Sequence, residues 1–433
     1  MNTKNSVFVR ATLSAILLVF VGPMTAFAAG LWLSSSGPVN RSMGGASVAA
    51  PIDAVGALFW NPGTISGLPN NEMAFGMEML LADIEVSSTF LGVSGKTSAE
   101  PGVVPLPSFG WVHHIDGTDV TIGLFTGAVA GFRTNYPADP TNPILNPNGP
   151  PMGLGIGRVF TEAEFSMIAP IVSVALTDRL SIGMGPTLSL GRMAIDPFIF
   201  APPNAAPPNG FASGRASRQH FGGGAQAGIY YTNNRGLSFG AAIKSPQWFE
   251  TFRFHSEDAA GNPRVVSIKV DLPMIVSIGM AYSTCDDTVF ALDVRYFDYK
   301  STDFWGTPGF FNADGSLTGL DWSDTFSVAL GIQKRLSDIT IIRFGYSYNP
   351  SPIRASEMAY NFPAPLIQEH IINTGVSINL AESVSMNLAY SYVVENEKNG
   401  PILTPGTNLP IPGSSVGVEL AVHILSMGIS VVY

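Results

Sequence analysis

The stretch that decides the fold is residues 383–391, which reads Ser-Val-Ser-Met-Asn-Leu-Ala-Tyr-Ser. Large apolar side chains alternate in it with small ones: one face carries Val384, Met386, Leu388 and Tyr390, and the other carries Ser383, Ser385, Asn387, Ala389 and Ser391. Such alternation is typical of a β-strand whose two faces meet different surroundings. The same period runs through residues 180–190, 237–244, 266–282, 325–333 and 371–380.

The length of these segments indicates what surrounds them. Several keep the alternation for ten or more residues, whereas strands of globular proteins run to about 5–6 residues. A tilted strand needs about 9–11 residues to cross a bilayer. The less apolar face is rich in Gly, Ser, Thr and Asn rather than in Lys and Glu. We therefore interpret the segments as membrane-spanning strands.

The connections between the segments support the same interpretation. Six short turns lie near 116–117, 177–178, 233–236, 285–287, 336–338 and 381–382. Seven longer connections alternate with them, near 92–106, 132–162, 196–217, 251–264, 301–320, 351–364 and 397–412. Thirteen connections join fourteen strands, and transmembrane barrels have an even strand number with short turns at one end. We predict an all-β fold in which residues 72–433 form a 14-stranded antiparallel transmembrane β-barrel, closed so that lipid meets no unpaired backbone.

The composition excludes several classes of protein. Hydrophobic residues make up 46% of the chain and charged residues 12%, where soluble domains carry about 25% charged residues. With 27 Phe and 12 Tyr the chain is not typical of a disordered protein. Its net charge of -10 argues against a nucleic-acid partner. The single cysteine, Cys285, cannot form an internal disulfide.

The first 28 residues have the pattern of a signal peptide. Lys4 and Arg10 form a basic region before an apolar run over 11–22, and Ala26-Phe27-Ala28 matches a cleavage site. The alternative is a retained anchor, but the run is shorter than the ~18–20 residues of a spanning helix. We expect export across the inner membrane, a mature chain from about Ala29, and a place in the outer membrane of a Gram-negative bacterium.

Residues 29–71 lack the strand alternation. Ala and Leu at helical spacing followed by Asn61-Pro62-Gly63 predict a short helix ended by a turn. The segment is too small to fold alone, and a barrel of this size has a lumen wide enough to need filling. We predict an N-terminal, partly helical hatch that plugs the lumen, the alternative being a periplasmic extension.

The sequence of this segment resembles a known signature. Arg41-Ser42-Met43-Gly44-Gly45-Ala46-Ser47-Val48-Ala49, then Asp53-Ala54 and Ala57-Leu58-Phe59-Trp60-Asn61-Pro62-Gly63, is similar to the N-terminus of the FadL/TodX family, whose pattern reads R-A-M-G-G-A-x-x-A, D-A and an aromatic before N-P-A. Ser42, Pro51-Ile52 and Gly63 depart from that pattern. The hatch motif consists of Met43, Gly44, Gly45, Asn61, Pro62 and Gly63.

The resemblance implies a plugged fourteen-stranded barrel that takes up long-chain fatty acids or, in some members, aromatic hydrocarbons. In such a barrel the substrate adheres to hydrophobic external loops, moves to a pocket beside the hatch, and leaves sideways where a strand kink opens the wall. We expect this function here. The alternatives are aromatic hydrocarbon uptake by the same mechanism, a non-transporting adhesin or receptor barrel, and a polar-solute porin.

Two predicted external loops are unusually apolar. Exposed apolar runs usually mark binding, and proline-stiffened loops could hold a groove ready before a ligand arrives. Alternatively, the loops pack on one another as a lid. The candidate capture residues are Ile144, Leu145, Met152, Leu154, Phe198, Ile199, Phe200 and Phe211.

Some charged residues fall on the strand faces that should point into the lumen. Lys269, Arg295 and Arg343 could each pair with a carboxylate ligand. More commonly such cations pair with a neighbouring acid, and here they would brace the plug.

The chain ends on an aromatic residue, Tyr433, in an alternating run from Met427. We expect it at the membrane interface and as the signal for the barrel-assembly machinery; a bland terminal aromatic is the alternative. Upstream, the apolar set has the opposite phase, and the switch at Ile424-Leu425 predicts a bulge.

Catalysis finds no support in the sequence. The six histidines are scattered without metal-ligand spacing. We expect no enzyme activity, no cofactor and no metal. The expected partners are hydrophobic small molecules, outer-membrane lipids and lipopolysaccharide.

Overall fold

The computed structural model describes residues 30–433 except 148–154, 204–209, 215–216 and 258–260. The predicted signal peptide and the capture residues Met152 and Leu154 lie outside the described residues.

Within that part of the chain, fourteen long antiparallel strands form one closed barrel. They are β1 (Glu72–Phe90), β3 (Val103–His114), β4 (Val120–Tyr136), β5 (Val159–Thr177), β6 (Leu180–Asp196), β7 (His220–Thr232), β8 (Leu237–Lys244), β13 (Met274–Ser283), β14 (Thr288–Asp298), β15 (Thr325–Arg335), β16 (Thr340–Tyr348), β17 (His370–Ala381), β18 (Val384–Gly400) and β19 (Ser415–Val432). The barrel closes where β1 pairs with β19, from Glu72 opposite Val432 to Thr89 opposite Ser415. The predicted fold class is confirmed.

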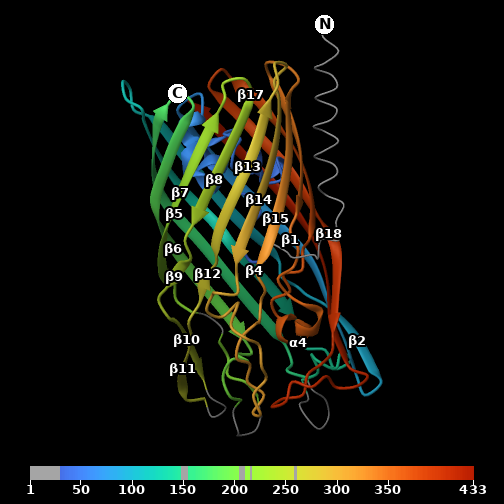
Figure 1. Cartoon of the computed structure of the whole chain (residues 1–433). Coiled ribbons are helices and arrows are strands. Elements are labelled where there is room, and N and C mark those ends of the chain that lie inside the picture. Colours follow the sequence, from blue (N-terminus) through green and yellow to red (C-terminus); the bar gives the residue numbers. More distant parts are fainter. Residues whose placement is uncertain (1–29, 148–154, 204–209, 215–216, 258–260) are drawn as a thin grey trace.

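The remaining strands lie toward the end of the barrel with the long connections. β2 (Val93–Ser98) folds back on β1, and β10 (Phe252–Glu257) and β11 (Pro263–Ile268) form a separate hairpin. β9 (Gln247–Phe249) is separated from β8 by Pro246, and β12 (Asp271–Leu272) is separated from β13 by Pro273. The two short strands pair with each other. The short turns gather at the opposite end, at the top of Figure 1, in the predicted positions.

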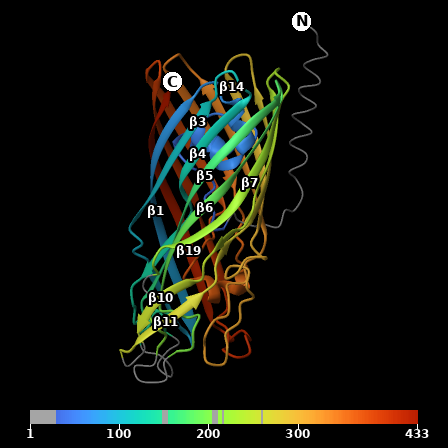
Figure 2. The same ribbon diagram turned by 90° about the vertical axis from the view of Figure 1, so that its left-hand side faces the viewer.

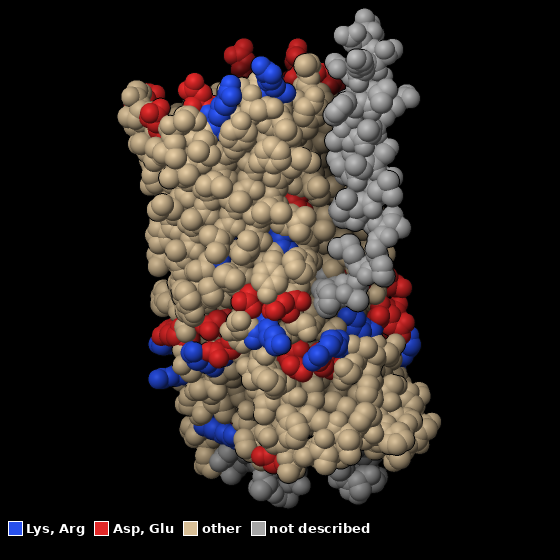
Figure 3. Space-filling view, viewed as in Figure 1, with Lys and Arg blue, Asp and Glu red and all other residues tan. Residues whose placement is uncertain are grey.

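The strand alternation separates a lipid-compatible exterior from a small, polar interior. Leu188, Ile278 and Met427 are exposed, whereas the adjoining Ser189 and Ser277 are buried. In the face seen in Figure 3, a wide band nearly free of charged side chains lies between the charged short-turn rim and a second belt of charges nearer the long loops. That band is the surface a bilayer would cover.

The predicted bulge at Ile424-Leu425 is wrong. β19 pairs with β1 in unbroken register through these residues, with Ile424 buried inside and Leu425 exposed outside. The apolar set changes because, nearer the long loops, the inner face meets an apolar lumen, whereas in the spanning half the outer face meets lipid. The register shift of this region lies in β18 instead, between Val393 and Asn396.

The segment before β1 lies inside the barrel, in the half nearer the short turns (Figure 2). It contains α2 (Pro38–Ser42), α3 (Ala54–Trp60) and the 3-10 helix η1 (Pro62–Gly67). Every residue of α3 is buried, and Asp53 caps the helix by accepting from the Gly56 amide at 3.3 Å. The segment is therefore a hatch that fills the lumen.

Two further short helices, η2 (Ala355–Glu357) and α4 (Met358–Asn361), lie between β16 and β17. No helix of the described residues has the length and apolar character needed to cross a membrane.

Candidate functional site

The glycines of the hatch motif allow the hatch chain to touch the wall. Gly44 has a φ of 66°, and a Cβ there would lie 2.9 Å from backbone atoms of Leu330 and Tyr346 in β15 and β16. Gly45 has a φ of 86°, and its Cβ would lie 2.1 Å from the Ser34 carbonyl oxygen. Only glycine combines this left-handed backbone with so close an approach.

The Asn-Pro-Gly turn joins the hatch to β7. The Asn61 Nδ2 donates to the carbonyl oxygens of Val48 at 2.7 Å and Ile229 at 2.9 Å, while Oδ1 accepts from the Gly63 amide. Pro62 begins η1. This side chain satisfies backbone groups of the hatch and of the wall at once.

The lumen arginines are held by the protein itself. The Arg295 Nη2 donates to Asp293 at 2.7 Å and to the Gly45 carbonyl at 2.6 Å, and its guanidinium lies 3.6 Å from the ring centroid of Trp60. Arg343 donates to Gln333 and Ser377, each at 2.6 Å. For Arg295 these contacts favour the bracing role over the carboxylate-binding role, because Gly45 and Trp60 belong to the hatch. The contacts of Arg343 instead join β16 to β15 and β17 of the wall.

Lys269 does not line the lumen. Its side chain is 66% exposed among the long loops, with Nζ 2.5 Å from Asp303 Oδ2. The sequence interpretation placed residues 266–282 on one strand, but the structure divides them among β11, β12 and β13. The inward prediction for Lys269 assumed one continuous alternation over this range. Lys269 lies between β11 and β12, and Pro273 separates β12 from β13, so the alternation is not continuous.

Sequence reasoning missed two other buried cations. Arg41 of α2 forms two contacts with Glu78 of β1, at 2.5 and 2.7 Å. Lys244, at the end of β8, donates to Gln226. The alternation along β1 could have identified Glu78 as an inward-facing acid. Its partner Arg41 lies 37 residues away in the sequence, and the two meet only when the hatch packs in the lumen.

The apolar long loops mostly pack on one another. Ile144, Leu145 and Phe198 are buried and Phe211 is half-buried. Ile199 and Phe200 line an apolar cavity of about 30 Å³ under the loops, which is room for about one water-sized group. The loops therefore form a lid with a small apolar cavity beneath it.

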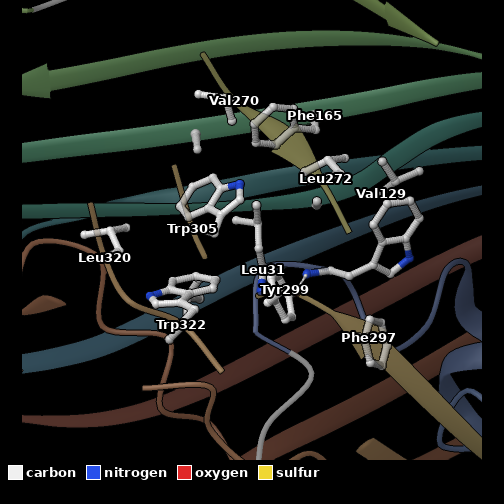
Figure 4. Packing of buried hydrophobic residues seen from close by; sticks show 14 of the residues in the cluster. Leu31, Val129, Phe165, Val270, Leu272, Phe297, Tyr299, Trp305, Leu320 and Trp322 are labelled. Carbon is white, nitrogen blue, oxygen red and sulfur yellow. Dashed lines mark hydrogen bonds between the residues drawn. The ribbon is translucent and has the colours of Figure 1, made fainter. Parts of the chain in front are cut away.

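A second cavity, of about 100 Å³, lies in the lumen beside residues 30–34. Its lining is mainly aliphatic and aromatic, and includes Leu31, Trp32 and Leu80. Tyr299 fixes this chain segment, because its hydroxyl oxygen accepts from the amides of Leu31 at 2.8 Å and Trp32 at 3.3 Å (Figure 4). Burial raises the pKa of Tyr299, so its hydroxyl stays protonated.

The wall is interrupted between β3 and β4. The pairing of these strands ends at Ser108 opposite Gly127, although β3 continues to pair with β1 as far as Val103. Pro105 and Pro107 lie in the stretch of β3 that leaves β4, and proline has no amide to donate to a neighbouring strand. A cavity of about 310 Å³ lies at this break.

The hatch covers part of the β4 edge that β3 leaves open. The Leu33 amide donates to the Val129 carbonyl at 2.9 Å, and the Gly131 amide donates to the Leu31 carbonyl at 3.2 Å. The register of β4 with β5 shifts at the same level, between Ala128 and Ala130.

Phe132 lies where the three cavities meet. It is the one described residue that lines the cavity under the loops, the lumen cavity and the cavity at the wall break. Its ring packs edge-on against Trp305, with centroids 6.3 Å apart. The side chain separates spaces that are otherwise adjacent.

Tyr433 lies half-exposed at the short-turn end. Its hydroxyl accepts from Trp111 Nε1 at 2.8 Å, and its amide donates to the Asn71 carbonyl. The strand ends are tied together there; the assembly signal remains a prediction.

The comparisons with known proteins agree with this geometry. The family model "Outer membrane protein transport protein (OMPP1/FadL/TodX)" matches residues 19–431. No curated protein sequence matches.

Solved structures of transporters share the fold at low sequence identity. The Pseudomonas putida toluene transporter TodX is 16% identical with a TM-score of 0.68, over 93% of this chain and 99% of that one. A Pseudomonas aeruginosa FadL homologue is 14% identical with a TM-score of 0.71 over the same shares. The Ralstonia pickettii toluene transporter TbuX is 16% identical with a TM-score of 0.65, over 92% of this chain and 98% of that one.

The family match extends over nearly the whole chain, and the closed barrel with its hatch is the fold of the matched structures. The family consists of passive transport channels for hydrophobic compounds in the outer membrane, not of enzymes. The chain therefore belongs to the OMPP1/FadL/TodX family of outer membrane transport proteins.

Proposed function

We propose that hydrophobic cargo enters under the long loops, passes Phe132 into the lumen cavity beside residues 30–34, and leaves sideways between β3 and β4. The observation that carries this route is the common lining residue Phe132, which places all three cavities next to one another. The hatch fills the half of the lumen nearer the short turns (Figure 2). The break in the wall is therefore the exit next to these cavities.

We infer long-chain fatty acids as the cargo. The lumen cavity is lined by aliphatic side chains such as Leu80, Leu420 and Val422, and burial of each CH₂ of a chain gains about 0.8 kcal/mol. Capture by the long-loop residues remains part of this proposal, with Ile199 and Phe200 as the contacts that line the cavity under the loops.

Aromatic hydrocarbons are the second candidate. Phe132, Phe200, Phe304 and Tyr360 surround the cavity under the loops, and aromatic rings pack favourably against other rings. TodX and TbuX, two of the similar structures, are toluene transporters.

Blocking the wall break tests the route. Ala128 lines the break, so Ala128→Trp should fill it and lower the uptake of labelled hexadecanoate and toluene into proteoliposomes at least tenfold. The matched control is Ala241→Trp, which adds the same ring in an outer groove of β8. Equal uptake in the two variants would exclude exit between β3 and β4.

A further inference from the structure

The lumen cavity beside residues 30–34 contains buried polar atoms that the mainly apolar lining does not satisfy. Among the described residues, Trp32 Nε1, Asn349 Nδ2 and Gln368 Oε1 have no hydrogen-bond partner. All three residues line this cavity. Buried polar groups are paired in nearly all native structures, so two donors and one acceptor here indicate a polar ligand group.

The positions of these groups are fixed by the backbone. The Asn349 amide donates to the Glu369 carbonyl at 2.7 Å, which holds Asn349 beside Gln368, and Asn349 is 2% exposed. The Gln368 Nε2 faces the Gly30 carbonyl at 3.5 Å. That contact sets the orientation of the amide and leaves Oε1 as an acceptor.

The charged groups around the cavity are already paired. Arg41 and Arg133 line it, but Arg41 is bound twice by Glu78, and Arg133 contacts Glu162 at 2.6 Å and Glu164 at 3.1 Å. The other titratable groups near the polar atoms are engaged too: the Tyr299 hydroxyl with the 31–32 amides, and Glu369 with Lys398 at 3.9 Å.

A carboxylate would therefore enter this cavity without a free cation in the described lining. An ion that loses its water without a counter-charge is strongly disfavoured. A neutral group that both donates and accepts hydrogen bonds meets no such penalty. The Gln368 oxygen in particular would repel an anion but accept from a hydroxyl.

We propose that this cavity binds the head of its cargo in a neutral form, as a protonated carboxylic acid or an alcohol. The carbonyl or hydroxyl oxygen of the head accepts from Asn349 and Trp32, and its O–H donates to Gln368 Oε1. A fatty-acid anion takes its proton from bulk water before it binds and returns it after release. This inference rests on the proposed uptake of hydrophobic cargo and deepens it.

A ligand series with one chain length tests the head group. Binding of hexadecanoic acid, hexadecanol, methyl hexadecanoate and hexadecane is measured to the full-length protein in nanodiscs between pH 5 and 9. Affinity for the acid, relative to the alcohol in the same nanodiscs, should fall about tenfold per pH unit above the pKa of the acid, because only its neutral fraction binds. Affinity for the alcohol should not change with pH and should exceed that for the ester.

Two near-isosteric variants separate hydrogen bonding from fit. Asn349→Leu and Gln368→Met should each weaken binding of the alcohol and of the protonated acid about tenfold, with hexadecane unaffected. Asn70→Leu, which removes an exposed amide just before β1 at the short-turn end, is the control and should change nothing.

Each failure has a distinct meaning. Equal affinity for the acid across the pH range, or variants that keep the full preference for alcohol over hexadecane, would overturn the neutral-head proposal and mean that water satisfies these atoms. Absence of binding of all four ligands by the unmodified protein would instead count against the proposed function itself.

Discussion

At the scale of single residues, substitution of Gly44 tests whether close contact between the hatch and the wall holds the hatch in place. Gly44→Ala adds a Cβ 2.9 Å from wall backbone at a φ of 66°, and the left-handed backbone alone costs roughly 1–2 kcal/mol. The wall cannot move aside without breaking pairing between β15 and β16. We expect a loosened hatch, measured as leak current in planar bilayers.

Gly92 provides the matched control for that substitution. It has a similar φ of 81°, but a Cβ there would meet nothing within 4 Å. Gly92→Ala therefore carries the backbone strain without the collision, at a site away from the hatch. If neither variant raises the leak current in planar bilayers, close contact at Gly44 does not hold the hatch.

Phe132 is the residue whose size should set the rate of passage. Phe132→Trp enlarges a ring between cavities of about 30 and 100 Å³, and cores as tight as this do not accept added volume without strain. We expect hexadecanoate uptake into proteoliposomes to fall several-fold, while Phe132→Leu keeps it. Phe160→Trp, on the neighbouring β5, is the control; an equal loss there would mean a general defect of the barrel.

At the scale of the element, β3 decides where the wall opens. In Pro105→Thr/Pro107→Thr both missing amides are restored, so β3 can extend its pairing with β4 and compete with residues 31–33 for the same edge. We expect slower uptake and faster hydrogen exchange at the Leu33 amide, which would lose its acceptor on β4. Pro170→Thr in β5 serves as the control, and unchanged exchange in the double variant would contradict this account.

The same strand shows what could be predicted from the sequence. The alternation and the turns determined the strand number and the end at which each connection lies. However, the sequence analysis predicts a long connection near 92–106, a range that includes the first residues of β3. In the structure β3 begins at Val103 because β1 pairs with its other edge. A strand segment that pairs with one neighbour only, as residues 103–107 do, cannot be recognised from the alternation of side chains in the sequence.

The site was predictable only in part, for a related reason. Alternation correctly turned Arg295 and Arg343 inward, but their partners lie on the hatch and on neighbouring strands. The polar atoms of Asn349 and Gln368 lie beyond the ends of β16 and β17, where no alternation applies. Their role depends on segments that come together only when the barrel closes.

At the scale of the whole molecule, the hydrogen bonds between wall strands do not depend on the hatch. Neighbouring strands pair around the closed sheet, except where β3 leaves β4. The hatch is held by side-chain contacts such as Arg41 to Glu78, by the cation–π contact of Arg295, and by backbone hydrogen bonds of residues 31–33 to β4. Loss of residues 29–45, which include α2, therefore leaves the pairing between wall strands intact but frees the Val129 carbonyl and the Gly131 amide of β4. It also opens lumen space that water can fill, which rehydrates Glu78.

Deletion of residues 29–45 should consequently yield a folded barrel that has lost selectivity. We expect the heat-modifiable gel mobility of a folded barrel, raised conductance in planar bilayers, and passage of small polar solutes that the intact protein excludes. The matched control is Arg41→Leu/Glu78→Leu, which removes the ion pair but keeps the hatch; apolar replacement of a buried pair is often neutral or stabilising by about 1–4 kcal/mol. A deletion variant as closed as this control would mean that loops or strands, rather than the hatch, seal the lumen.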